Sequence, residues 1–133
     1  GVDTMLGGAG DDYIDGGRGL DYYNGGDGAD NFVFRSIADM GVGAAARDQI
    51  RDFDTTEGDR VNLYLIDANT MIAGNQAFAI TSGYSGAGGE LVLFDFVVSG
   101  VDVTVASMDV DGDSVTDAQI YIVGGADAGD FVL

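Results

Sequence analysis

The sequence predicts an all-β chain in which stacked nine-residue repeats pack onto a small β-sandwich. The first quarter of the 133 residues repeats a glycine- and aspartate-rich nonapeptide. The remainder contains short apolar runs separated by Gly, Asn and Asp turns, as strands with tight connections do. No segment shows the sustained periodicity of about 3.6 residues that marks a long amphipathic helix. We therefore expect a repeat region at residues 1–34 and a C-terminal sandwich at residues 35–133.

Three complete copies of the pattern G-G-x-G-x-D-x-U-x, in which U is apolar, occupy Gly7–Asp15, Gly16–Asn24 and Gly25–Val33. A partial copy precedes them at residues 1–6, so we expect that the natural chain extends upstream. Glycines recur at positions 1, 10, 19 and 28, aspartates at 3, 12, 21 and 30, and apolar residues at 5, 14, 23 and 32. A flexible Gly/Asp linker is the alternative, and the in-phase apolar residues argue against it.

Each nonapeptide divides into a six-residue loop and a three-residue strand whose central apolar side chain points inward. The predicted inward residues are Met5, Ile14, Tyr23 and Phe32. One repeat makes half a coil, so loops 18 residues apart fall on the same side, separated by the strand spacing of about 4.7–4.9 Å. This geometry places Asp3 over Asp21 on one side and Asp12 over Asp30 on the other.

Carboxylates stacked this closely repel one another unless a cation lies between them. Ca²⁺ suits such a site because it accepts about six to eight oxygen ligands in a flexible arrangement, whereas Mg²⁺ requires a tighter octahedron. Glycine supplies the positive-φ turns that direct successive carbonyls toward one centre. Zinc is disfavoured because the chain has no His and no Cys. The candidate ligand residues in the repeats are Asp3, Gly8, Gly10, Asp12, Gly17, Gly19, Asp21, Gly26, Gly28 and Asp30.

The composition is strongly acidic, with 23 Asp and Glu against 5 Arg and a formal net charge of −18. Such a chain repels nucleic acids and anionic membranes and attracts multivalent cations. The sequence contains no apolar run of membrane-spanning length and no N-terminal secretory signal. We therefore expect neither a nucleic-acid partner nor membrane insertion.

The second region predicts several short strands, a loop and one helical turn. Strands are expected at Gln49–Phe53, Arg60–Leu63, Ala77–Ile80, Glu90–Val98, Val101–Ser107, Ala118–Val123 and Asp130–Leu133. Leu65–Ile72 is expected to form a short helical turn and Gly83–Gly89 an exposed loop. Asp109–Asp117 resembles a calcium loop, but Gly112 at its fourth position departs from the EF-hand, and a tight hairpin turn is favoured. Asp59 and Arg60 are interpreted as surface charges, and no pair of carboxylates stands out as an acid/base couple.

The repeats resemble those of RTX proteins exported by Gram-negative bacteria, and the resemblance continues beyond them. The segments that follow are similar to the C-terminal domain of serralysin-type metalloproteases, over essentially the whole chain. These segments are Asn31–Ser36, Arg47–Phe53, Gly58–Leu63, Asp67–Asn69, Gly86–Leu91, Met108–Ile120 and Asp130–Leu133. The R-modules of alginate epimerases are a second, slightly weaker match.

The serralysin resemblance implies a parallel β-roll packed on a β-sandwich. It also implies that Asp39 lies opposite Asp21 and Asp48 near Asp30, where they complete the last calcium sites; solvated loop carboxylates are the alternative. The family's C-terminal export signal is an acidic residue followed by apolar ones, which the closing Asp130–Leu133 matches, although an ordinary terminal strand is also consistent. The family's zinc motif lies in an upstream domain, and this chain has no His.

The expected function is that of a secreted, non-catalytic module that folds when it binds Ca²⁺. It would direct type I secretion of an upstream domain, expected to be a zinc metalloprotease, from a Gram-negative bacterium. Its expected partners are that catalytic domain and the secretion machinery. A polysaccharide-binding accessory module is the alternative; five Arg within a net charge of −18 argue against an anionic sugar unless Ca²⁺ bridges it. A third class is enzymatic, with the chain as a protease fragment.

Overall fold

The computed structural model describes all 133 residues and consists almost entirely of β-strands. The strands are β1 Thr4–Ala9, β2 Tyr13–Asp15, β3 Tyr22–Asp27, β4 Asn31–Val33, β5 Asp48–Ile50, β6 Arg60–Asn62, β7 Ala79–Thr81, β8 Glu90–Val98, β9 Val101–Asp109, β10 Ala118–Val123 and β11 Phe131–Val132. Two 3₁₀ turns, η1 Ile37–Asp39 and η2 Ala128–Asp130, are the only helical elements. Neither has the length of a membrane-spanning helix. The predicted all-β class is confirmed.

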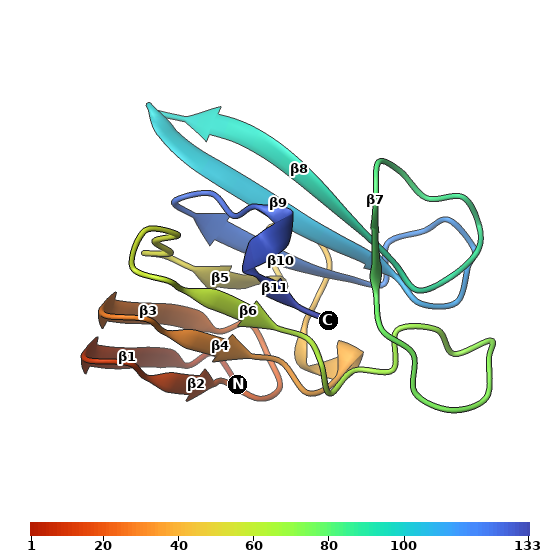
Figure 1. Ribbon diagram of the computed structural model, residues 1–133, viewed down its shortest axis with the longest axis horizontal. Coiled ribbons are helices and arrows are strands. Elements are labelled where there is room, and N and C mark those ends of the chain that lie inside the picture. The colour runs from red at the N-terminus through yellow and green to blue at the C-terminus, as the bar shows by residue number, and fades with distance from the viewer.

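The strands form two sheets, and the N-terminal strands alternate between them (Figure 1). One sheet has the order β1-β3-β5-β10-β9-β8-β7 and the other has the order β11-β6-β4-β2. In the repeats, Met5 of β1 lies beside Tyr23 of β3, and Ile14 of β2 lies beside Phe32 of β4, in parallel register. Each of these pairs is 18 residues apart, so one coil comprises two repeats, as the sequence predicts.

The roll continues into the C-terminal half without a break in hydrogen bonding. β5 and β6 add one further coil, because β3 pairs with β5 and β4 pairs with β6, both in parallel. β5 then pairs with β10, and β9 and β8 extend the larger sheet in antiparallel order. The predicted division at residues 34 and 35 stays a prediction, and two strand ladders cross it.

The core is formed by the inward side chains of both sheets. Ile14, Tyr23 and Phe32 are buried as predicted, while Met5 is half-buried because β1 lies at the open edge of its sheet. The rings of Tyr23 and Phe32 pack in a T-shaped arrangement with centroids 6.2 Å apart, and the centroids of Tyr23 and Phe34 lie 5.5 Å apart. Such aromatic pairs add about 0.5–1.5 kcal/mol each beyond the area that they bury. The repeats therefore share one apolar core with the C-terminal strands.

The predicted helical turn at Leu65–Ile72 is wrong. The segment forms irregular turns in which Asp67 Oδ1 accepts from the Asn69 N–H and Asn69 Oδ1 accepts from the Met71 N–H. Asp and Asn side chains that bind nearby main-chain donors compete with helix formation, which explains the difference. The predicted loop at Gly83–Gly89 is confirmed.

Candidate metal centre

The repeat aspartates stack into two columns on opposite sides of the roll. In the first, the Asp3 N–H donates to Asp21 Oδ1 at 2.8 Å, and the Asp21 N–H donates to Asp48 Oδ1 at 2.8 Å. We call Asp3, Asp21 and Asp48 the Asp48 column. Asp21 and Asp48 therefore each accept a hydrogen bond from the main chain of the coil before them, which fixes the position of one carboxylate oxygen in each.

The second column is built in the same way. The Asp12 N–H donates to Asp30 Oδ1 at 2.9 Å, and the Asp30 N–H donates to Asp59 Oδ1 at 2.9 Å. We call these three residues the Asp59 column. The predicted stacking of Asp3 over Asp21 and of Asp12 over Asp30 agrees with the observed contacts.

The predicted placement of Asp48 near Asp30 is wrong, because Asp48 contacts Asp21 instead. The place beside Asp30 is taken by Asp59. β5 pairs with β3 and β6 with β4, so the coil that follows the repeats puts Asp48 and Asp59 on opposite sides. Asp59 is buried rather than a surface charge. Its signal in the sequence is the D-x-U triplet, since Asp48-Gln-Ile50 and Asp59-Arg-Val61 match the ends of the repeats.

The second oxygens of the repeat aspartates distinguish the candidate site. Oδ2 of Asp12, Asp21 and Asp30 is buried and has no hydrogen-bond donor. In contrast, Oδ2 of Asp48 accepts from the Tyr23 hydroxyl at 3.4 Å, and Oδ2 of Asp59 accepts from the Asp54 N–H at 2.9 Å. A buried carboxylate oxygen without a partner is costly, so each repeat holds one acceptor that a cation would satisfy.

The raised pKa values of three column carboxyl groups also indicate that the columns lack a positive charge. Burial raises the pKa of the carboxyl groups of Asp30 and Asp59 and raises that of Asp48 to about 7. The neighbouring negative charge of Asp21 raises the pKa of Asp48 further, although the hydrogen bond from the Asp21 main chain opposes it. Without a cation, the columns therefore hold carboxylates in surroundings that disfavour their charged form.

The glycines shape the loops around these oxygens. A Cβ on Gly25 would lie 2.0 Å from Asp30 Oδ2, so the first glycine of the repeat leaves room for the carboxylate. Gly26 has a φ of +100°, and a Cβ there would lie 1.8 Å from the Gly8 carbonyl oxygen. Main-chain carbonyls of one loop therefore approach the loop 18 residues later closely. Carboxylate and carbonyl oxygens are the ligands that Ca²⁺ prefers. The glycines at the second and fourth positions of the repeats all have a positive φ; they are Gly8, Gly10, Gly17, Gly19, Gly26 and Gly28.

Comparison with known proteins identifies the family. The family model described as peptidase M10 serralysin C terminal matches residues 1–133. The chain belongs to this serralysin C-terminal family. The predicted serralysin resemblance is thereby confirmed, and the parallel β-roll that it implied agrees with the observed parallel ladders.

The fold of this serralysin C-terminal chain is also similar to subunits of an alginate-modifying enzyme. The AlgE6R3 subunit of the Azotobacter vinelandii mannuronan C5-epimerase is 25% identical with a TM-score of 0.65, over 98% of this chain and 67% of that one. The AlgE6R2 subunit of the same organism's enzyme is 20% identical with a TM-score of 0.64, over 99% and 88%. The latter likeness supports the fold alone. No curated protein sequence matches the chain.

Asp39 lies beside the Asp48 column of the serralysin-family roll. It sits in η1, is largely buried, and accepts from the Arg35 N–H at 3.3 Å. With Gly19 and Leu20 it lines a cavity of about 300 Å³, and its charge contributes to the raised pKa of Asp48. Asp39 is therefore close to the Gly19 loop, where the sequence expects a ligand; its binding of metal stays a prediction.

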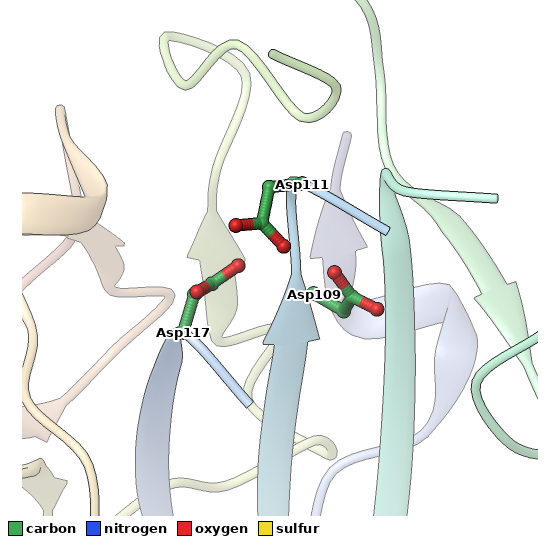
Figure 2. Close-up of side chains that lie close together, drawn as sticks. All are labelled: Asp109, Asp111 and Asp117. Atoms are coloured by element: carbon green, nitrogen blue, oxygen red, sulfur yellow. The ribbon is translucent and has the colours of Figure 1, made fainter. Parts of the chain in front are cut away.

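A third group of carboxylates lies outside the repeats, where residues 110–117 connect β9 to β10. Figure 2 shows Asp109, Asp111 and Asp117 directed toward one another, with oxygens within 4.8 Å. Asp109 is buried, but its two oxygens accept from the N–H groups of Gly112 at 2.7 Å and Ser114 at 2.9 Å. Main-chain donors thus account for this arrangement as a turn, in contrast to the unpartnered oxygens of the repeats.

Proposed function

We propose that this serralysin C-terminal chain is a non-catalytic, calcium-binding module whose folding depends on the ion. The observation that carries the proposal is the set of buried, donorless Oδ2 atoms of Asp12, Asp21 and Asp30. Each stands in a glycine loop that a main-chain carbonyl of a neighbouring coil approaches. Ca²⁺ would be held by these aspartates and by carbonyls of the repeat glycines, where it would neutralise the stacked carboxylates.

Calcium concentration would then control folding. A site that exists only in the folded chain makes metal-binding free energy part of the folding free energy. Extracellular calcium modules bind at about 10⁻⁴–10⁻³ M, so the ion would be too scarce inside a cell and sufficient outside it. With a net charge of −18, the empty chain would also resist compaction. The module would stay unfolded before export and fold after it.

The same transition would serve type I secretion of an upstream catalytic domain from a Gram-negative bacterium. The closing residues belong to β11, in which Phe131 is buried and pairs with Val61 of β6. In an unfolded chain this terminal segment would be free for the secretion machinery, and after folding it would be covered. Family membership supports a metalloprotease as the upstream partner, with the zinc chemistry in that domain and not in this chain.

Circular dichroism of the purified chain tests the proposal. In EDTA we expect a mainly unfolded spectrum, and added Ca²⁺ restores the β signal while Mg²⁺ at the same concentration does not. Asp21→Ala should raise the calcium concentration at the midpoint of folding at least tenfold. It removes the donorless Oδ2 atom of Asp21 and also the acceptor of the Asp3 N–H. Asp27→Ala is the matched control, since Asp27 is an exposed repeat aspartate outside both columns. Equal β content with and without calcium would count against the proposal.

A polysaccharide-binding role is the second candidate, and one surface favours it. The guanidinium of Arg51 lies 3.7 Å from the centre of the Tyr22 ring, and that of Arg47 lies 4.6 Å from the centre of the Tyr121 ring. Tyr22 and Tyr121 both align with Gln49 across the larger sheet, so the stacks share one face. Aromatic and Arg groups together are suited to a uronic-acid chain. NMR titration with alginate oligomers should shift the signals of both tyrosines if this role holds, and leave them unchanged if it does not.

A further inference from the structure

Besides the surface with the two Arg–Tyr stacks, the larger sheet has an exposed region at the β8–β9 hairpin, which projects beyond the neighbouring strands (Figure 1). β7 pairs with β8 only at Glu90–Val92, so the edge of β8 from Leu93 onward has no neighbouring strand. Ser99 and Gly100, with φ of 52° and 78°, form the two-residue turn that closes the hairpin at the pair Val98–Val101.

The position of the turn determines which main-chain N–H and C=O groups of β8 point toward its free edge. In an antiparallel pair, alternate residues direct their N–H and C=O groups to the partner strand. Because Val98 closes the turn against Val101, the even-numbered residues of β8 bond to β9. Asp95 and Val97 therefore point their N–H and C=O groups away from β9. The hydrogen bond from Ala79 of β7 to the Gly89 carbonyl follows the same alternation. This edge can accept another strand.

The side chains along this edge are apolar and exposed. Phe94, Phe96 and Val98 are 46%, 52% and 48% exposed on the outer face, and Val97 is 69% exposed on the inner face. Asp95 is the only charge in this part of the strand. Natural edge strands are usually protected by charges, prolines or bulges, so an open apolar edge indicates a partner.

A cavity of about 450 Å³ adjoins the inner face of the hairpin. Three carboxylates line it, those of Asp95, Asp102 and Asp127. None of them has an ion pair, because the only ion pair of the chain joins Arg35 and Asp15. The Thr104 hydroxyl, buried at the floor, donates to Asp95 Oδ1 at 2.7 Å and accepts from the Ala126 N–H at 3.0 Å. Hydrogen bonds therefore hold the wall in place and leave its negative charge uncompensated.

The spacing of these carboxylates favours an organic cation over a metal ion. The only three acidic side chains whose oxygens come within 4.8 Å of one another are Asp109, Asp111 and Asp117, far along β9 from this cavity. A lysine ammonium or an arginine guanidinium on a long side chain can instead lie between more widely spaced carboxylates.

We propose that the free edge of β8 and the adjoining acidic cavity together bind an extended segment of another protein in which apolar outward residues alternate with polar inward residues, one of them basic. Added to the edge as a strand, such a segment would bond to Asp95 and Val97 through its main chain. Its outward residues would pack on Phe94 and Phe96, and a basic inward residue opposite Asp95 would enter the cavity. The chain's net charge of −18 opposes a second copy as the occupant and attracts a basic one.

The probe is a peptide of about ten residues, with valine outward, threonine inward and one central lysine inward. Its control has the same composition, with the lysine exchanged for the neighbouring valine. The titration is followed by NMR in saturating Ca²⁺. Shifts at the Asp95 and Val97 amides, with at least tenfold weaker binding of the control, are expected. No shift at these amides, or equal binding of the two peptides, would overturn the proposal.

Variants separate the edge from the charge. Val97→Pro removes an N–H at the free edge without removing a bond to β9, and should abolish peptide binding. Val97→Lys, whose side chain would reach the cavity, should also abolish it if the proline variant folds poorly. Asp95→Asn should weaken binding at least tenfold, whereas Asp113→Asn, exposed and outside the cavity, should have no effect. Unchanged binding by these edge and cavity variants contradicts the proposal.

Sedimentation of the free chain distinguishes the remaining occupant. A monomer is expected, and a dimer that Val97→Lys dissociates would show that a second copy occupies the edge, which overturns the proposal. Circular dichroism of every variant in Ca²⁺ reports folding separately, so a failure of calcium-dependent folding and a failure of this docking site give different results.

Discussion

The main-chain N–H of Asp21 donates to the buried carboxylate of Asp48, 27 residues later, at 2.8 Å. One hydrogen bond thus joins the last complete glycine repeat on this side of the roll to β5, which lies outside the repeats. Asp48 is fully buried, and its other oxygen meets the Tyr23 hydroxyl. Asp48 and Asp59 therefore have protein donors for both carboxylate oxygens, whereas Asp12, Asp21 and Asp30 each keep one free oxygen for an ion.

Stability without calcium should decrease as the pH rises. Burial, with the negative charge of Asp21, raises the pKa of Asp48 from 3.8 to about 7 in the folded chain. The folded state therefore binds this proton more tightly than the unfolded state. The contribution is fully present below pH 3.8 and is lost between pH 3.8 and about 7. In EDTA, circular dichroism should therefore show a smaller folded fraction at pH 8 than at pH 5.

Calcium should reverse this dependence, because the ion requires deprotonated carboxylates. Melts in millimolar Ca²⁺ should therefore give the higher midpoint at pH 8. Asp48→Asn is the control, since it keeps an acceptor for the Asp21 N–H and removes the titrating group. A steep pH dependence that persists unchanged in this variant would assign the effect to other carboxylates.

Loss of Asp59 should destabilise the folded chain even in saturating calcium. Its oxygens accept from the N–H groups of Asp30 and Asp54 at 2.9 Å each. Asp59→Ala leaves the buried Asp30 donor unsatisfied, which costs about 1–3 kcal/mol. Urea denaturation in Ca²⁺ measures the difference. Asp113→Ala, an exposed carboxylate in the β9–β10 connection, should change the free energy of unfolding by less than about 0.5 kcal/mol.

The sequence determines the coils that carry the complete repeat more closely than the coil that follows them. A spacing of 18 residues is enough to predict the stacking of Asp12 over Asp30, because each repeat contributes the same half coil. Past residue 34 the spacing lengthens to 27 residues on one side and 29 on the other, so Asp48 lies beside Asp21 and not beside Asp30, where the family resemblance placed it. The D-x-U triplets survive there, since inward apolar residues are needed for the core, but such short patterns are not specific.

The candidate site depends on facts that a repeat pattern does not contain. Asp30 Oδ1 accepts a hydrogen bond from a neighbouring coil, whereas Asp30 Oδ2 has no donor. This difference depends on the donors around the carboxylate, which the repeat pattern does not specify. Likewise, the failed helical turn at Leu65–Ile72 depends on side chains that bind local main-chain groups, a competition that apolar periodicity does not reveal.

Gly26→Ala should prevent or greatly weaken folding. Gly26 has a φ of +100°, and a Cβ there would lie 1.8 Å from the Gly8 carbonyl oxygen, so neighbouring coils would have to separate. Gly83→Ala is a matched control, because that position has an ordinary φ and no atom within 4 Å of an added Cβ. Calcium titrations followed by circular dichroism should show no transition, or a much higher midpoint, for the first variant and an unchanged one for the second. Equal midpoints would mean that the coils are not closely stacked in solution.

Truncation of the Phe131 side chain should raise the calcium concentration that the chain needs to fold. Its side chain is buried in the shared core, and its strand pairs with β6, which follows Asp59 directly. Phe→Ala in a core costs about 3–5 kcal/mol, and this loss must be offset by more bound calcium. Phe131→Ala should therefore raise the calcium midpoint of folding severalfold, whereas Val132→Ala, 37% exposed on the same strand, should raise it far less. Amide hydrogen exchange of β6 checks the route: faster exchange is expected in the Phe131 variant, and unchanged protection there would show that β11 adds little to the roll.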